Sequence, residues 1–342
     1  GALFSIYLGK DDRNSLKTAV AHAFALIMAV TIIINIIVYI FIDSILVFLQ
    51  VPNELYDSMR EYLVIIFAGL AATSLYNFFA CLLRAVGNSV TPIWFLGISA
   101  LTNIALDLLF VLVFNIGIAG AAAATIIAQY FSGIGILIYA LLKRCDFIPQ
   151  NQHLEYNKKI LGEILSLSVL TCAQQSAMNF GILLIQRLVD SFGAVTMAAF
   201  AAAVKIDTFA YLPVQDFGNA FSTFIAQNYG AGKSERLKEG FRKATVLSSV
   251  FSLVISALVF IFAELLMQIF ISPDETAVIA SGAEYLRIEG CFYVGIGCLF
   301  LLYGFYRAIK RPGMSVILTI VSLGTRVALA YALAPVVGEV GI

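Results

Sequence analysis

The sequence predicts an all-α, polytopic membrane helical bundle with two pseudo-symmetric lobes, and three observations support this fold class. The first is composition: of 342 residues, 61% are hydrophobic and 12% are charged, and the mean hydropathy is +0.94. Soluble domains average about 45–50% apolar and about 25% charged residues, so these values are typical of helical membrane proteins. The second observation is a series of long apolar stretches, and the third is an internal repeat.

Nine apolar stretches are long enough to cross a bilayer, which takes about 20 residues in a helix. We expect spans at Thr18–Ile42, Tyr62–Leu83, Val90–Phe114, Gly120–Leu142, Leu161–Leu188, Ala194–Gln227, Ala244–Phe270, Glu284–Tyr306 and Met314–Ala334. The stretch Ala194–Gln227 is overlong and contains Pro213, which cannot donate a backbone hydrogen bond. We therefore expect a bend there.

The longest polar stretch, residues 143–160, predicts a cytoplasmic linker between an N-terminal lobe, 1–142, and a C-terminal lobe, 161–342. Loop charges alternate along the chain. Lys and Arg gather around 10–17, 84, 143–159, 233–243 and 307–311, whereas the intervening loops contain few of them. Cytoplasmic loops of membrane proteins are enriched in Lys and Arg, so the first set is predicted to be cytoplasmic.

The internal repeat relates the two lobes. A shift of 223 positions pairs Arg84 with Arg307 and Ser99 with Ser322, and a shift of 221 pairs 51–54 with 272–275. Both copies begin in loops predicted to be cytoplasmic, so the repeat is parallel, about an axis along the membrane normal. By this repeat the intact protein should have twelve spans. We expect the sequence to be truncated at both ends, lacking nearly all of the first two spans and the whole of the last.

The second copy lacks one acidic feature of the first. Asn103 and Asp107 become Arg326 and Ala330 at the same shift. A carboxylate at bilayer depth costs a few kcal/mol or more, and such residues are by default functional. The repeat therefore predicts a polar site in only one half.

Several function classes are disfavoured. The formal net charge of zero argues against a nucleic-acid partner. The five cysteines show no CxxC or zinc-ligand spacing. No Ser/His, His/Glu or Asp/Asp pair lies at mid-span, so we expect no enzyme activity and no cofactor. A passive channel would not need two related lobes with a one-sided ion site.

Several motifs resemble those of bacterial MATE (multidrug and toxic compound extrusion) transporters. They are QNYGAGKSER at 227–236, its weaker copy LGKDDRNSLK at 8–17, RAVGNSVTP at 84–92, and AQQSAMNFG at 173–181. The resemblance covers essentially the whole chain. It implies twelve helices in two lobes and efflux of organic, often cationic compounds, driven by inward Na+ or H+. We expect a multi-pass protein of the bacterial cytoplasmic (inner) membrane, monomeric, with a small organic substrate and membrane lipid as its partners.

The resemblance also implies a coupling-ion site in the N-terminal lobe. Asn103, Asp107 and Thr125 match three of its residues in type and spacing, and a fourth, an Asp on the first helix, would precede residue 1. Asn103 and Asp107 are four residues apart and share a helix face. Their oxygen atoms suit Na+ bound at Asp107, or a proton on a desolvated carboxylate. The alternative is an Asp that serves helix packing, but its loss from the second copy favours ion binding.

Other polar residues are candidates for the substrate cleft. Lys205 and Asp216 lie in the overlong stretch, where Lys205 could instead pair with Asp207 or extend toward the outer headgroups. The remaining three are Gln174, Gln175 and Asn179, a stripe for which helix–helix hydrogen bonding is favoured over cleft lining.

The remaining ionisable residues receive simpler interpretations. Glu289 and Arg287 lie near the outer end of their span, where an exposed ion pair is expected. His22 and His153 have no metal-ligand neighbour, so a solvated or interfacial position is expected. The position of Arg326 stays open.

A second transport function is a flippase for lipid-linked saccharides, a relative in the same wider superfamily. It should show a more cationic central cavity, whereas away from the span ends this chain offers only Lys205 and Arg326 inside.

Overall fold

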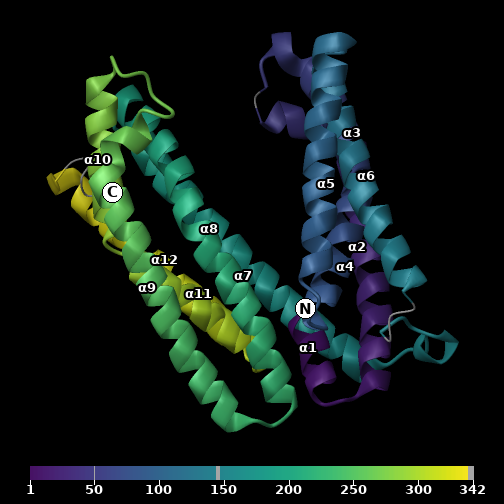
Figure 1. Ribbon diagram of the computed structural model, residues 1–342. Helices are drawn as coiled ribbons and strands as arrows, with labels where there is room; N and C mark the ends of the chain where they lie inside the picture. The colour runs from purple at the N-terminus through teal and green to yellow at the C-terminus, as the bar shows by residue number, and fades with distance from the viewer. Residues whose placement is uncertain (50, 144–146, 338–342) are drawn as a thin grey trace. The chain divides into compact units, whose positions relative to one another are not determined.

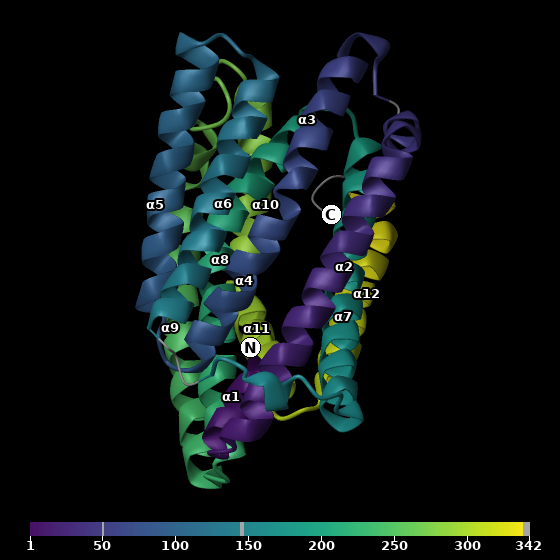
Figure 2. The same ribbon diagram turned by 90° about the vertical axis from the view of Figure 1, so that its right-hand side faces the viewer.

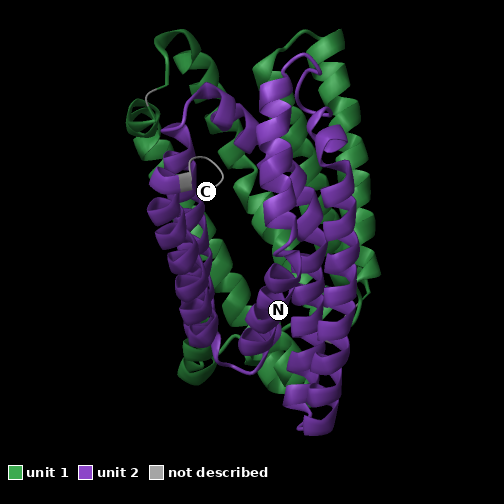
Figure 3. Ribbon diagram, turned by 90° about the vertical axis from the view of Figure 1, so that its left-hand side faces the viewer, with its two compact units in different colours: residues 1, 3–164 green, residues 2, 165–342 purple. Residues whose placement is uncertain are grey.

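The computed structural model describes residues 1–49, 51–143 and 147–337, and every regular element in these ranges is a helix. The chain divides into two compact units, which Figure 3 colours separately. Unit 1 comprises residue 1 and residues 3–164, and unit 2 comprises residue 2 and residues 165–342. The all-α fold class is confirmed.

Unit 1 is built around α6, which packs against α3, α4 and α5, while α2 packs against α3 and α4. Figures 1 and 2 both show α5 and α6 side by side. The α-helices of unit 1 are α1 (Ala2–Gly9), α2 (Arg13–Phe48), α3 (Tyr56–Ala68), α4 (Leu70–Ala85), α5 (Val90–Asp107) and α6 (Ile118–Leu142). A π-helical segment, Leu108–Val113, continues α5.

Unit 2 is built around α8 and α11, which pack against each other and against α9. In addition, α10 packs against α8 and α9, and α12 packs against α11. Its helices are α7 (Lys158–Asp190, whose first turns belong to unit 1), α8 (Ala194–Gly230), α9 (Ser234–Met267), α10 (Thr276–Gly290), α11 (Tyr293–Ala308) and α12 (Pro312–Val337).

The expected spans match the helices. The described residues contain 8 helices that are long and apolar enough to cross a membrane, or 9 if the bent pair α10–α11 forms one span. This pair bends by 54° at its break. By contrast, α8 continues as one helix through Pro213. The sharp break in unit 2 therefore lies in a different span from the one in which we expected a bend.

The repeat is visible in the backbone. Helix α4 ends at Ala85 and α11 ends at Ala308, which are 223 positions apart. The turns that follow place Gly87 (φ 92°) and Lys310 (φ 59°), again 223 apart, in the left-handed region. Since few non-glycine residues adopt positive φ, this agreement at Lys310 shows that the turn geometry itself is repeated.

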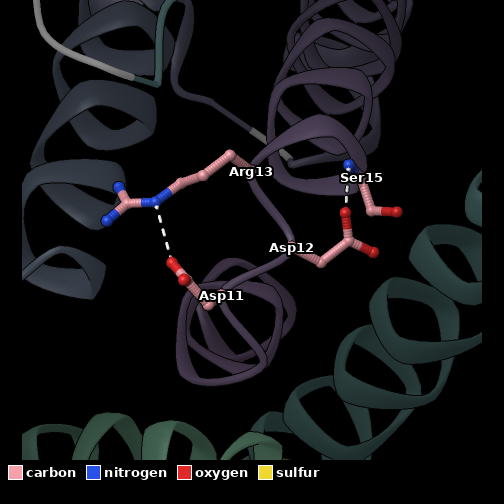
Figure 4. A network of polar contacts seen from close by, with 4 residues as sticks. All are labelled: Asp11, Asp12, Arg13 and Ser15. Atoms are coloured by element: carbon pink, nitrogen blue, oxygen red, sulfur yellow. Dashed lines mark hydrogen bonds and ion pairs between the residues drawn. The ribbon is translucent and has the colours of Figure 1, made fainter.

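The turn between α1 and α2 is closed by side chains (Figure 4). Asp12 caps α2, because its carboxylate accepts a hydrogen bond from the backbone N–H of Ser15 at 2.9 Å. Asp11 has φ 55° and lies 3.4 Å from the Nε of Arg13. The equivalent turn in unit 2 has Gly232 at φ 69°, 221 positions after Asp11.

Candidate functional site

Asn103 and Thr125 meet between α5 and α6. The Nδ2 of Asn103 donates to the Oγ1 of Thr125 at 3.4 Å, and Thr125 donates to the carbonyl of Ala121 at 3.0 Å. One turn earlier on α5, Ser99 donates to the carbonyl of Ala128 at 2.7 Å, which fastens the two helices together. The hydroxyl of Thr125 keeps one lone pair, and the carbonyl oxygen of Asn103 points away from this hydrogen bond.

Asp107 lies one turn beyond Asn103, at the last residue of α5. Its Oδ1 is fully enclosed and has no hydrogen-bond partner among the residues that the structure describes. The π-helical segment begins immediately afterwards, at Leu108. Such segments widen the backbone helix and are frequent at functional sites. The three residues thus offer a carboxylate, an amide oxygen and a hydroxyl along neighbouring turns of α5 and α6, a donor set of hard oxygens suited to a small cation.

The cleft candidates of unit 2 do not share one environment. Gln174 is buried, whereas Gln175 and Asn179 on the same helix are exposed. Lys205 is exposed, and its ammonium lies 5.7 Å from the centre of the Phe270 ring.

The acidic neighbours of Lys205 on α8 are placed differently. Asp207 is buried, and the described residues contain no ion pair between Lys205 and Asp207. Asp216 is exposed. The mutual salt bridge considered for Lys205 and Asp207 is therefore wrong.

Unit 2 contains a polar cluster that the sequence analysis missed. The Nη1 of Arg326 lies 3.3 Å from the Oε1 of Glu289, and its Nη2 donates to the hydroxyl of Tyr285 at 3.1 Å. The expected pairing of Glu289 with Arg287 is wrong, since Arg287 pairs with Glu264 at 3.0 Å. The prediction that only one half of the chain carries a polar site is also wrong. The sequence feature that could have revealed this cluster is the i, i+4 spacing of Tyr285 and Glu289, which puts both on one face of α10.

The two histidines also differ from expectation. His153 is buried, and its Nδ1 accepts from the backbone N–H of Gln150 at 3.2 Å. His22 is partly buried, and its Nε2 accepts from the backbone N–H of Asn157 at 3.1 Å. Both therefore accept hydrogen bonds from the polar stretch 143–160, and the buried His153 is not solvated. In the described ranges, no group of three or more His, Cys, Asp or Glu could hold a metal ion.

Comparison with known proteins gives consistent matches. A family model described as MatE matches residues 2–109 and 171–332. The probable multidrug resistance protein YpnP of Bacillus subtilis (strain 168) is 28% identical over 314 residues, which cover 92% of this chain and 70% of YpnP. The probable multidrug resistance protein NorM of Thermotoga maritima is 24% identical over 324 residues, which cover 93% of this chain and 69% of NorM.

The fold has counterparts among solved structures. A crystal structure of MATE in complex with MaL6 matches 99% of this chain and 77% of its own, with a TM-score of 0.94 at 21% identity. At this identity the match concerns the fold alone. The two ranges matched by the family model, however, make up most of the sequence, so the chain belongs to the MatE family, as its motifs predicted.

Proposed function

We propose that the protein is a secondary active transporter that exports small organic, often cationic compounds across the bacterial cytoplasmic membrane in exchange for Na+ or H+. The observation that carries this proposal is the enclosed Oδ1 of Asp107, which has no hydrogen-bond partner in the described chain. A carboxylate in a membrane helix is costly unless something compensates its charge. An entering cation or proton would supply that compensation.

The neighbours of Asp107 support an ion that comes and goes. Asn103 and Thr125 already contact each other at 3.4 Å, so the uncharged half of the site is formed before the ion arrives. Neither residue carries a positive charge, so neither one competes with the ion for Asp107. Binding would then neutralise the carboxylate at the junction of α5 and the π-helical segment. A change in helix hydrogen bonding at that junction is the proposed link to alternating access.

The names of the relatives support the class of substrate. YpnP and NorM are both named probable multidrug resistance proteins. Export of drug-like organic compounds by this chain is the corresponding proposal. The saccharide flippase gains no support from unit 2, because Arg326 is paired with Glu289 and Lys205 lies over the ring of Phe270. Arg326, already paired with a carboxylate, does not supply the cationic cavity that such a flippase needs.

A flux assay with controlled sidedness tests the proposal. Proteoliposomes are loaded with a fluorescent organic cation, and Na+ or H+ is raised outside. We expect efflux to accelerate with one of these gradients and to return to the basal rate when an ionophore collapses it. Equal efflux with and without either gradient would indicate a passive pathway and would contradict the proposal.

A further inference from the structure

An open groove of about 400 Å³ runs along the first half of α9. Three charged side chains line the end nearer the start of the helix, and three apolar side chains line the rest. They are Glu239, Arg242, Lys243, Val246, Leu247 and Val250. Their spacing of three and four residues places them on one face of the helix. The groove begins about a turn and a half after Ser234, at the end of unit 2 where α8 turns into α9 (Figure 1).

A different face of α9 packs against the rest of unit 2. A Cβ added at Gly240 would collide with the ring of Phe224 on α8. One and two turns further along, Ala244 is buried and Ser248 is buried, and Ser248 faces Gly297 of α11. The groove residues are therefore not needed for the packing of unit 2, and their face is left for another partner.

The apolar half of the groove lies at the start of a membrane span. Val246 and Leu247 are each 58% exposed, and Val250 is 53% exposed. These residues belong to the predicted span Ala244–Phe270, whereas Arg242 precedes it. Arg242 and Val250 are separated by about 12 Å along the helix. The groove thus passes from a charged end into the hydrocarbon region, as a phospholipid passes from its phosphate into its acyl chains.

The charged end of the groove carries one positive charge in excess. The Nζ of Lys243 lies 2.7 Å from the Oε1 of Glu239, so these two charges offset each other. Arg242 is exposed, and it forms no ion pair or hydrogen bond with any residue that the structure describes. A planar guanidinium can hold a phosphate group through two parallel hydrogen bonds. One phosphodiester, which carries a single negative charge, matches the excess.

The repeat indicates that these charges have a purpose beyond orienting the chain. Orientation in the membrane requires basic loops, and both copies have them, at 10–17 and 233–243. At the groove itself, the shift of 221 positions pairs Arg242 with Ala21 and Val250 with Ala29 of α2. The first copy therefore keeps an apolar helix face but lacks the arginine above it.

We propose that this groove, with Arg242 as its anchor, is a binding site for one anionic phospholipid. The guanidinium of Arg242 holds the phosphodiester, while an acyl chain lies on Val246, Leu247 and Val250. A soluble phosphate would use only the charged end and would leave the apolar half uncovered. This inference goes beyond the transport function proposed above and does not depend on Asp107.

Quenching of tryptophan fluorescence by brominated lipids tests the site. Trp94 is the only tryptophan of the chain, so Val250→Trp in a Trp94→Phe background places a single reporter at the apolar end of the groove. The protein is reconstituted into phosphatidylcholine vesicles that contain a small fraction of dibrominated phosphatidylglycerol, or the same fraction of dibrominated phosphatidylcholine. We expect the anionic quencher to associate with the reporter about fivefold more strongly, because one basic side chain at a membrane surface contributes about this factor.

Three variants separate a built site from a diffuse attraction. Arg242→Gln should abolish the preference, so that both quenchers act equally. Arg236→Gln removes the same charge from an exposed position outside the groove, about 9 Å nearer the start of α9, and should keep the preference. Ala29→Trp, the counterpart of Val250→Trp on α2 in the same Trp94→Phe background, should show no preference.

Three outcomes would overturn the proposal. Equal quenching by the two lipids in Val250→Trp would show that no anionic lipid is held there. An equal loss of preference in Arg236→Gln and Arg242→Gln, or the same preference in Ala29→Trp, would show a diffuse attraction instead of a site. Displacement of the brominated lipid by inorganic phosphate at constant ionic strength would show a site for a soluble anion. All of the substituted side chains are exposed, so these variants should fold as the wild type does.

Discussion

Asp12 and Asp107 carry the same carboxylate in opposite settings. Asp12 lies at the start of α2 and accepts a hydrogen bond from the backbone N–H of Ser15 at 2.9 Å. Asp107 lies where α5 passes into the π-helical segment, and its enclosed Oδ1 has no partner in the described residues. The first aspartate stabilises a turn, whereas the second is the carboxylate to which we assign the coupling ion.

The cap of α2 gives a residue-scale prediction. Asp12→Ala should lower the free energy of unfolding by about 1 kcal/mol, because the first turn of α2 loses a hydrogen-bond acceptor. Hydrogen bonds from Ser15 hold the pKa of Asp12 below its ordinary value. The difference between wild type and Asp12→Ala should therefore be constant above about pH 4, the ordinary pKa of Asp, and should vanish as the pH falls through the lower, folded value.

Thermal unfolding in detergent at several pH values measures this difference. Asp11→Asn is the control, since it removes only an exposed ion pair with Arg13 and keeps a residue that tolerates positive φ. Exposed pairs contribute about 0–1 kcal/mol, so its effect should be small. An Asp12→Ala effect that grows on acidification would contradict the assigned cap.

At the scale of helices, hydropathy predicted where the spans lie but not how they are interrupted. The π-helical segment after Asp107 and the 54° break between α10 and α11 depend on backbone hydrogen bonding and packing, which apolar content does not encode. Pro213 is the residue at which the sequence predicts a helix bend, yet α8 continues through it. The break between α10 and α11 instead leaves the carbonyl of Gly290 to accept from Ser256 of α9 at 2.6 Å.

Because a single sequence does not encode which helices pack together, only some of the site residues could be predicted. Asn103 and Asp107 share a helix face, and Thr125 follows from the resemblance. The structure shows that Asn103 and Thr125 contact each other, while their role with Asp107 stays a prediction. The polar cluster of unit 2 combines Tyr285 and Glu289 of α10 with Arg326 of α12. A single sequence shows that each of these residues is present, but it does not show which helices are neighbours in the fold.

The contact between α4 and α6 gives a prediction at the element scale. A Cβ at Gly133 of α6 would lie 2.5 Å from the backbone oxygen of Ala72 on α4. Gly133→Ala must therefore push the two helices apart, and we expect a loss of about 1–3 kcal/mol in the free energy of unfolding. Gly97→Ala on α5 is the control, because no atom lies within 4 Å of its added Cβ.

Thermal unfolding in detergent again supplies the measurement. Gly97→Ala should be neutral or slightly stabilising, since alanine has the better helix propensity. Equal stability of the two variants would show that α4 and α6 are not in close backbone contact at Gly133.

At the scale of the whole molecule, one position of the repeat is polar in both units. Asn103 on α5 and Arg326 on α12 are 223 positions apart, and each is the residue through which its helix contacts a neighbouring polar group. In unit 1 this position is neutral, and no cation of the described residues pairs with the nearby Asp107. In unit 2 the position is a cation, and the acids have come from other helices. The repeat has thus kept a polar residue at this position while changing its charge.

The alternation of loop charges predicts the orientation of both units in the membrane. In a cysteine-free background, Asp274→Cys should react with a membrane-impermeant maleimide in intact cells. Ser234→Cys, next to the basic stretch 233–243, should react only after permeabilisation. The reverse labelling pattern would contradict the cytoplasmic assignment of that stretch.

The most direct test of the central claim is ion-driven efflux by Asp107→Asn in proteoliposomes. The amide keeps the shape of the side chain but cannot take up the coupling charge, so we predict that gradient-driven efflux falls at least about tenfold. Asp43→Asn, which removes an exposed ion pair with Arg60 in the same unit, should retain wild-type efflux. Full ion-coupled efflux by Asp107→Asn would contradict the account.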